Sequence, residues 1–204
     1  MLFDLTCTIE DKMMVYPDDR TPLVYQTRSI EKDGYTNYML ESEMHTGTHI
    51  DGPLHMIEGK EKICDADINS FIGKACIIDC RGQGNINWKN EYEQIIKEKE
   101  IVLLMSGFDE FRGTEKYLNS HPVISQDFAA KLCSFNIKMI GLDFISPDKY
   151  PYHVHKTFMK NNILIAENLT NLNALIHIAD FEVIAFPLKI NADSAFARVI
   201  ARTL

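Results

Sequence analysis

The residues best suited to chemistry lie in one short stretch, which reads Met-His-Thr-Gly-Thr-His-Ile-Asp-Gly-Pro-Leu-His over residues 44–55. Three of the chain's seven histidines, His45, His49 and His55, fall within it, and Asp51 lies between the last two. In an extended segment side chains alternate between faces, so these four side chains share one face. Imidazoles and a carboxylate on one edge are typical ligands of a divalent metal ion. The stretch therefore predicts a metal site.

A helical conformation of this stretch is disfavoured by its own residues. A helix would also bring His45 and His49 together, because they are four positions apart. Gly47 and Pro53 oppose a helix, and a helical zinc protease needs a glutamate where this chain has Thr46. The alternative is a histidine-rich surface loop that binds nothing. The one-sided placement of the ligand types, with two glycines and a proline, favours the metal site.

Length and composition predict one globular domain over residues 1–204. With 46% apolar residues the chain can bury a sizeable core. Lys and Arg number 21 against 29 Asp and Glu, so the formal charge is −8, and no basic run is present to bind nucleic acid. No apolar run approaches the ~18 residues of a membrane span, and the N-terminus does not resemble a signal peptide. The five cysteines are an odd number without a CxxC pair, so we expect reduced thiols and a cytoplasmic location.

The elements expected to position the metal site form an α/β fold. Four apolar runs indicate buried strands, at residues 75–80, 101–105, 137–142 and 163–166. Helices are predicted around them, at residues 63–72, 87–99, 114–120, 125–134 and 155–162. Antiparallel strands are predicted towards the ends of the chain, at residues 2–7, 23–30, 35–43, 181–186 and 196–201, with a hairpin turn at 32–34. Together these predict a single compact domain with a mixed sheet and flanking helices.

A carboxylate at the end of a buried strand is the candidate for the second half of the site. Glu167 directly follows the apolar run 163–166, and ligands tend to bind at the carboxyl ends of strands in α/β sheets. His153 and His155 lie fourteen and twelve residues upstream, and a helix followed by a strand can return the chain to the same end of the sheet. The alternative is a strand-end glutamate that faces water. For His121 and His177 we expect structural roles.

The order of the motifs resembles the cyclase family of metal-dependent hydrolases, which includes bacterial kynurenine formamidases (arylformamidases) and isatin hydrolases. The specific motif is His45-x-Gly47-Thr48-His49-x-Asp51-x-Pro53-x-His55. Weaker motifs follow in the family's order, at residues 4–6 with 16–17, 106–107, 121–122, 141–143 with 146–147, 167–169, and 186–189 with Arg198. The resemblance therefore spans almost the whole chain.

The resemblance implies a swivelling β/β/α fold, a binuclear metal site with zinc or in some members manganese, and a homodimer or tetramer. Asp51 and Glu167 would bridge the two metals. His155 is preferred over His153 because its twelve-residue spacing from Glu167 matches the family. The implied metal ligands are His45, His49, Asp51, His155 and Glu167, and His55 matches the general acid/base.

The resemblance also implies hydrolysis of a small amide or lactam by metal-bound hydroxide, which is arylformamidase-like chemistry. An imidazole such as His55 is suited to moving a proton to the leaving nitrogen near neutral pH. Isatin-type ring opening, a metal-binding protein without turnover and a structural zinc site are the alternatives. Candidates for orienting the metal ligands are Glu41, Glu43, Ser106 and Asp143.

The substrate pocket departs from the family at its N-terminal motif. The formamidases have a tryptophan before the proline, where this chain has Tyr16, and Asp18 replaces a usual glycine. Tyr16 is therefore the expected substrate-binding residue. A phenol ring is smaller than an indole and adds a hydroxyl group, so a substrate other than N-formylkynurenine becomes possible.

Overall fold

A mixed sheet organises the part of the chain that the computed structural model describes, residues 1–97 and 99–204. Eight strands of these residues follow the order β1 (Leu2–Asp4), β12 (Ser194–Thr203), β11 (Phe181–Pro187), β5 (Ile72–Asp79), β7 (Ile101–Met105), β9 (Met139–Leu142), β10 (Leu164–Glu167) and β4 (His49–Asp51). Strand β4 also pairs with β12, so the sheet closes on itself. The short strand β4 is thus the seam at which the two ends of the sheet meet.

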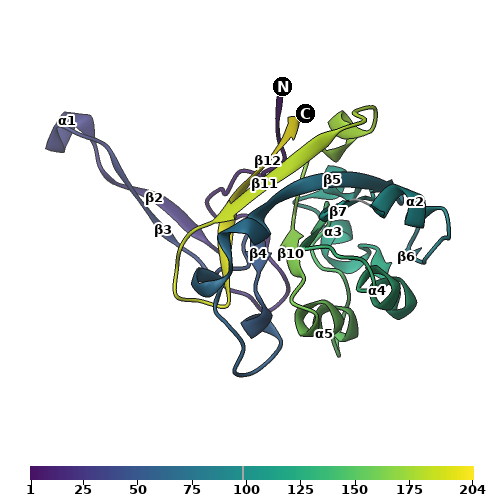
Figure 1. Ribbon diagram of the computed structural model, residues 1–204. Coiled ribbons are helices and arrows are strands. Elements are labelled where there is room, and N and C mark those ends of the chain that lie inside the picture. Colours follow the sequence, from purple (N-terminus) through teal and green to yellow (C-terminus); the bar gives the residue numbers. More distant parts are fainter. Residues whose placement is uncertain (98) are drawn as a thin grey trace.

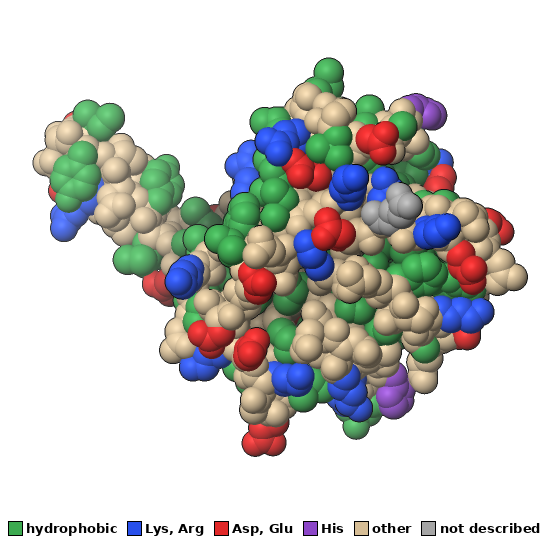
Figure 2. Space-filling model, in the orientation of Figure 1, with side chains coloured by type: hydrophobic (Ala, Val, Ile, Leu, Met, Phe, Trp, Pro, Cys, Tyr) green, Lys and Arg blue, Asp and Glu red, His purple; other side chains and the backbone are tan. Residues whose placement is uncertain are grey.

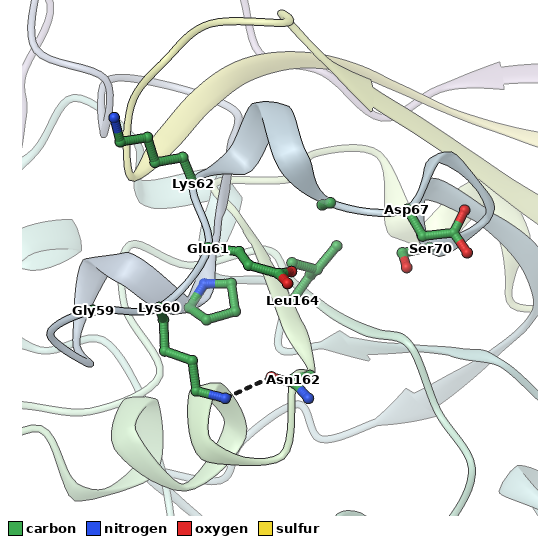
Figure 3. A pocket seen from close by; sticks show the side chains of 10 residues that line it. Gly59, Lys60, Glu61, Lys62, Asp67, Ser70, Asn162 and Leu164 are labelled. Atoms are coloured by element: carbon green, nitrogen blue, oxygen red, sulfur yellow. Dashed lines mark hydrogen bonds between the residues drawn. The ribbon is translucent and has the colours of Figure 1, made fainter.

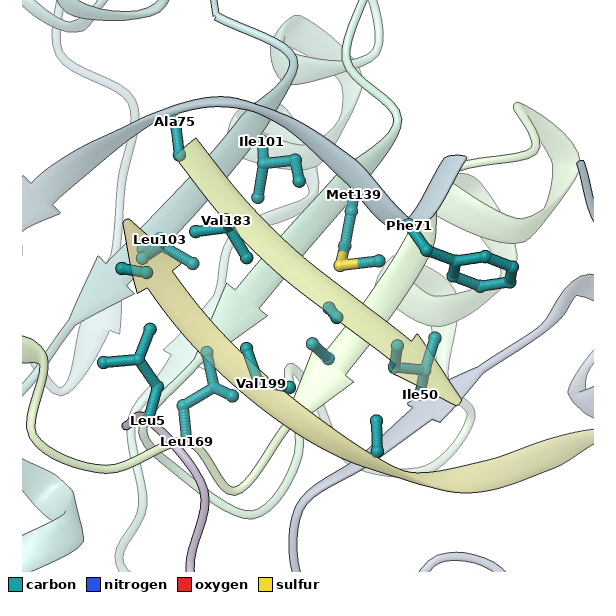
Figure 4. Close-up of a cluster of buried hydrophobic side chains, with 14 of the residues drawn as sticks. Leu5, Ile50, Phe71, Ala75, Ile101, Leu103, Met139, Leu169, Val183 and Val199 are labelled. Atoms are coloured by element: carbon teal, nitrogen blue, oxygen red, sulfur yellow. The ribbon is translucent and has the colours of Figure 1, made fainter. Parts of the chain in front are cut away.

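The four strands predicted to be buried form the parallel part of the sheet. β5, β7, β9 and β10 run parallel, while β11, β12, β1 and β4 pair antiparallel. Strand β7 shows why its sequence is wholly apolar. Leu103 faces the interior of the closed sheet (Figure 4), whereas Val102 and Leu104 face the other side. The predicted α/β class with a mixed sheet is confirmed.

Helices cover the outer face of the parallel strands (Figure 1). They are α2 (Tyr92–Ile96), α4 (Gln126–Leu132) and α5 (His153–Lys160), and a further helix, α3 (Glu115–Asn119), packs against the turn at Phe108–Phe111. The predictions for α3 and α4 are confirmed, with Thr114 and Ser125 as N-caps that accept from the backbone N–H three residues on. No helix of the described residues combines the length and the apolar character needed to cross a membrane.

Three local predictions differ from the structure in detail. The helix expected from Asn87 begins only at Tyr92. The Asn87 side chain donates to the Asn85 carbonyl and closes a turn after β6 (Asn85–Ile86), so it does not cap a helix. The predicted helix also includes position 98, which lies outside the described residues. Segment 63–72 contains two separate 3-10 turns, η2 (Ile63–Asp65) and η3 (Ile68–Phe71). The hairpin predicted around 32–34 is present, but its connection is longer than a tight turn and contains a one-turn helix, α1 (Ile30–Asp33), closed by Gly34 at φ 79°.

The predicted hairpin stands away from the rest of the molecule. β2 (Leu23–Arg28) and β3 (Asn37–Glu41) pair with each other and carry α1 at their tip. Figures 1 and 2 show this arm projecting from the body, with hydrophobic side chains over its surface. The remaining short elements are β8 (Val123–Ile124), paired with β6, and the 3-10 turns η1 (Pro53–His55), η4 (Phe108–Phe111) and η5 (Leu172–Leu175).

Candidate metal centre

The seam strand β4 brings the two halves of the predicted site together. His49 pairs with Glu167 of β10, and Asp51 pairs with Ser194 of β12. His49, Asp51 and Glu167 are all buried, and the His49 Nε2 atom lies 3.2 Å from Asp51 Oδ1 and 3.5 Å from Glu167 Oε2. Residues more than a hundred positions apart therefore meet because the sheet closes here.

His45 reaches the cluster by a turn and not by the extended conformation predicted for it. Gly47 adopts φ 62°, in the left-handed region that glycine favours, and this turn folds His45 back over β4. His45 Nδ1 then lies 2.9 Å from Asp51 Oδ1 and 3.3 Å from His49 Nε2. The extended prediction is correct only for His49–Asp51, because Pro53 starts the 3-10 turn η1.

Backbone and carboxylate partners set the orientation of the buried imidazoles. His49 Nδ1 is 2.8 Å from the Gly47 carbonyl and so donates to it, which leaves Nε2 facing the carboxylates. His155 Nδ1 is 2.5 Å from Asp148 Oδ1, which leaves its Nε2 at 3.4 Å from Glu167 Oε1. Both rings therefore present Nε2 to the same small volume.

The structure separates the two candidate histidines of α5. His155 is buried and faces Glu167 and Asp51, with 3.9 Å between its Nε2 and Asp51 Oδ2. His153 is exposed at the start of the helix, and its carbonyl accepts from Thr157. Of these two histidines, His155 is the one that lies beside the buried carboxylates.

The buried carboxylates at the centre of the cluster lack partners that a cation would supply. Both oxygens of Asp51 and the Oε1 atom of Glu167 are buried without an aligned hydrogen-bond donor among the described residues. The nitrogens near these oxygens belong to the imidazoles of His45, His49 and His155, and burying ionised carboxylates is costly unless positive charge lies beside them, so the cluster suits a bound cation. His45, His49 and Asp51 offer ligand atoms within 4.8 Å of one another. This set of nitrogen and oxygen donors suits zinc or manganese.

In the absence of a metal ion, protonated histidines supply positive charge to the cluster. Burial by itself lowers the pKa of His45, but the carboxylates of Asp51 and Asp193 outweigh it and raise the pKa to about 11. Burial likewise lowers the pKa of His155, yet the Asp148 and Glu167 carboxylates raise it to about 10. Burial raises the pKa of Asp51, but the adjacent imidazolium groups of His45 and His49 bring it well below its ordinary value.

An open pocket of about 330 Å³ borders the cluster and is lined by His45, His55, Tyr16, Tyr152, His155 and Glu167. His55 lies in η1 with its ring 4.1 Å, centroid to centroid, from that of His45. Burial and the Tyr152 hydroxyl raise the pKa of Tyr16 to about 12, so Tyr16 is a neutral phenol at neutral pH. The structure thus places the predicted acid/base and substrate-binding residues in one pocket wall.

Asp148 and Asp193 contact imidazoles of the cluster and were not predicted from the sequence, whereas the four predicted orienting residues have other partners. Glu41 accepts from the Tyr25 hydroxyl and Glu43 from the Arg20 backbone N–H. Ser106 and Asp143 hydrogen-bond to each other across the ends of β7 and β9. His121 donates from Nδ1 to the Leu118 carbonyl, which agrees with the structural role expected for it, whereas His177 is exposed.

A second pocket is larger but holds none of the predicted ligands. It measures about 390 Å³ and is open to solvent (Figure 3). Its wall includes Lys60, whose Nζ donates to Asn162 Oδ1 over 3.2 Å, together with Glu61, Lys62 and Asp67. With no imidazole and no buried unpaired carboxylate, this pocket gives no indication of chemistry.

The fold and the histidine–carboxylate cluster define a metal-dependent hydrolase of the cyclase type. A family profile described as "Putative cyclase" matches residues 3–149, and the chain belongs to this cyclase family. Kynurenine formamidase of Bacillus cereus is 31% identical over 209 aligned positions, which cover 98% of this chain and 97% of that protein. Kynurenine formamidase of Bacillus mycoides is 32% identical with the same coverage.

Solved structures share the fold. Isatin hydrolase A from Labrenzia aggregata, bound to benzyl benzoate, superposes with a TM-score of 0.86 at 23% identity, over 98% of this chain and 93% of that one. Isatin hydrolase A from Ralstonia solanacearum gives 0.87 at 20% identity, over 98% and 91%. Taken together, family membership and the curated relatives support a metal-dependent amide hydrolase.

Proposed function

We propose that this chain hydrolyses the C–N bond of a small aromatic formamide or a related amide, as an arylformamidase does. The observation that carries the proposal is the pair of buried carboxylates, Asp51 and Glu167, which lie among three imidazoles without an aligned hydrogen bond to three of their oxygens and border an open pocket. The kynurenine formamidases of Bacillus are the relatives that support this substrate class.

Two divalent metal ions, zinc or manganese, are proposed to bind in this cluster. The residues that would hold them are His45, His49, Asp51, His155 and Glu167. When bound, such ions lower the pKa of water towards about 7 and polarise a carbonyl oxygen. Five protein ligands with two carboxylates exceed what one zinc ion usually takes.

His55 is proposed to move a proton to the leaving nitrogen. Its Nδ1 is 3.1 Å from Asp193 Oδ2, and the ring lies in the pocket wall. No described residue hydrogen-bonds to its Nε2, so this atom can exchange a proton with a substrate in the pocket. Tyr16 and Tyr152 line the same pocket and would hold an aromatic ring.

Opening of a lactam ring, as the isatin hydrolases carry out by their name, is the alternative. This reaction would use the same metal ligands and the same His55. The fold that the chain shares with the isatin hydrolases supports it as the alternative. The two activities differ in the shape of the substrate, so direct comparison of N-formylkynurenine, formanilide and isatin distinguishes them. A metal-binding protein without turnover would hydrolyse none of them.

The test is metal analysis of the purified protein combined with turnover of these three compounds. We expect about two metal ions per chain after reconstitution with zinc or manganese, and loss of hydrolysis after chelation that returns on adding metal. One metal ion or fewer per chain after reconstitution, or hydrolysis that survives complete chelation, would contradict the binuclear hydrolase.

A homodimer, or a tetramer built from it, is proposed as the assembly. Strand pairing puts Val24 beside Leu40 on one face of the arm and Tyr25 beside Met39 on the other. The described part of the chain leaves Tyr25, Met39 and Leu40 each more than 40% exposed. An isolated two-stranded hairpin is marginally stable in water, so an arm that is apolar on both faces is best explained by contact with a second copy.

Light scattering after gel filtration tests this assembly. We expect the mass of a dimer or tetramer for the wild type and a shift towards monomer when Tyr25 and Met39 are both replaced by serine. Lys32→Ser at the tip of the arm is the matched control. A monomeric wild type at micromolar concentration would contradict the proposal.

The five free cysteines support a proposed location in the reducing cytoplasm.

A further inference from the structure

Asp193 lies in the loop between β11 and β12, and its carboxylate contacts two histidines of the site. The Asp193 Oδ2 atom is 2.9 Å from His45 Nε2 and 3.1 Å from His55 Nδ1. A carboxylate oxygen has two lone pairs and can accept from both N–H groups. We propose that Asp193 is a positioning residue that fixes both imidazoles at once, turning Nδ1 of His45 to the ligand cluster and Nε2 of His55 to the substrate pocket.

The loop that carries Asp193 is held in place by the seam of the sheet. The Gly52 backbone N–H donates to the Asp193 carbonyl at 2.9 Å, and the Ile63 N–H donates to the Ala192 carbonyl at 2.9 Å. A Cβ atom at position 52 would lie only 2.9 Å from the Asp193 carbonyl oxygen, so glycine is what allows this close approach. The next residue, Ser194, already pairs with Asp51 in β12. The position of Asp193 is therefore fixed by its backbone.

For His45, the contact decides which ring nitrogen can bind a metal. His45 Nε2 hydrogen-bonds to Asp193 and lies 3.0 Å from Ser194 Oγ, while His45 Nδ1 lies 2.9 Å from Asp51 Oδ1. A carboxylate that accepts from the distal N–H of a ligating histidine fixes its tautomer and raises its basicity as a ligand. Loss of Asp193 would free the ring to rotate and would weaken metal binding.

For His55, the same carboxylate decides which nitrogen faces the substrate. A hydrogen bond from Nδ1–H leaves Nε2 as the basic atom, and this is the arrangement by which an aspartate orients a catalytic histidine in other hydrolases. The contact of the His55 ring with the His45 ring limits rotation further. This part of the inference rests on the proposed function, because it presumes that His55 transfers a proton.

Asp193 could instead be a metal ligand together with His45 and His55, since their ligand atoms lie within 4.8 Å of one another. The geometry favours positioning. The Asp193 side chain is 35% exposed and its Oδ2 already contacts two ring nitrogens, whereas the unpaired buried oxygens belong to Asp51 and Glu167. The two roles predict different losses on mutation, so one experiment separates them.

The experiment compares Asp193→Asn and Asp193→Ala with Asn191→Ala, an exposed position of the same loop, in zinc-loaded protein labelled with ¹⁵N-histidine. In the wild type we expect NMR to show His55 in its Nδ1–H tautomer. In Asp193→Ala this signal should shift towards the Nε2–H tautomer, and zinc affinity should fall about 10–100-fold in a chelator competition. Against the substrate that the wild type hydrolyses best, kcat should fall about 10²–10⁴-fold with a smaller change in KM.

Asp193→Asn keeps the side-chain volume, so it controls for a folding defect in Asp193→Ala. We expect it to show the same changes to a smaller extent. The inference is overturned if both variants keep the wild-type tautomer of His55 and the zinc affinity of Asn191→Ala. Loss of one bound zinc with an unchanged His55 tautomer would make Asp193 a ligand and would also overturn it. If the wild type hydrolyses no amide but the tautomer and affinity change as expected, positioning stands and the proposed function fails.

Discussion

Asp148 offers the sharpest test of how this centre is held together. Its buried carboxylate accepts two hydrogen bonds. Oδ1 accepts from His155 Nδ1 at 2.5 Å, and Oδ2 accepts from the Val154 backbone N–H at 2.6 Å. The second contact serves the first turn of α5, whose N-cap residue Tyr152 provides no side-chain hydrogen bond. One side chain therefore both caps the helix and orients the ligand that the helix carries.

Replacing Asp148 with asparagine keeps the shape but leaves one of these donors without an acceptor. A buried unsatisfied donor costs about 1–3 kcal/mol, so the free energy of unfolding of the metal-free protein should fall by that order. The loss of an outer carboxylate partner of a ligating histidine should weaken zinc binding about 10–100-fold. Asp127→Asn is the matched control, because this aspartate on α4 is 67% exposed and should change stability by about 0.5 kcal/mol or less.

The stability of the metal-free protein should fall as the pH rises, because His155 is protonated in the folded state. Burial opposes the charge on His155, but Asp148 and Glu167 raise its pKa from 6.5 to about 10, so the folded state holds a proton that the unfolded state releases. That contribution is complete below the unfolded pKa of 6.5 and is lost as pH rises to about 10. The metal-free wild type should therefore lose stability across this window, and Asp148→Asn should show a shallower slope.

Urea unfolding of metal-free protein at several pH values across this window, with zinc competition by a chelator, measures these effects. The difference in stability between wild type and Asp148→Asn should be largest at the acidic end, where His155 is charged in both states. The reasoning is refuted if Asp148→Asn matches Asp127→Asn in unfolding free energy, in pH slope and in zinc affinity.

Three further substitutions test other parts of the structure. His55→Ala should keep both metals and the fold but lose about 10²–10⁴-fold in turnover, whereas loss of metal would show that His55 is a ligand. Tyr16→Trp should raise kcat/KM for N-formylkynurenine if the smaller ring disfavours that substrate; wild-type turnover near about 10⁴ M⁻¹s⁻¹ with no gain would contradict this. Gly141→Ala should lower the free energy of unfolding by about 1–3 kcal/mol in a urea titration, because its Cβ would lie 2.5 Å from Leu103 Cδ2 and 2.7 Å from Leu169 Cδ1; an unchanged midpoint would refute the clash.

The sequence predicted most of the sheet because its signals there are local. The run at 101–105 is apolar at every position, and the strand has these same bounds. Ser125 predicted the start of α4 through its own side chain, which accepts from the Phe128 N–H. The form of the hairpin connection and the start of the helix after Asn87 differ from the prediction because other local hydrogen bonds, made by Ser29 and by Asn87 itself, competed with the expected ones.

The site was predictable where its residues follow one another in the chain and unpredictable where they do not. The alternation of His49 and Asp51 along one strand is visible in the sequence. Asp193 lies 138 residues from His55 and 148 from His45, in a loop with no pattern of its own, so its contact exists only because β12 pairs with β4. Asp148 is seven residues from His155, but nothing local shows which side chain will face the ring.

Closure of the sheet and assembly of the centre are the same structural event. Strand β4 is three residues long and pairs on both sides, and two of its residues, His49 and Asp51, carry proposed ligands. Pairing with β10 supplies Glu167, and pairing with β12 supplies Ser194 and the loop that holds Asp193. A strand this short contributes few hydrogen bonds, and it buries the Asp51 carboxylate without an aligned hydrogen bond. Its pairing with β10 and β12 is therefore stabilised most when a cation is bound. Metal binding should therefore stabilise the seam more than β5 and β7, parallel strands that do not pair with β4.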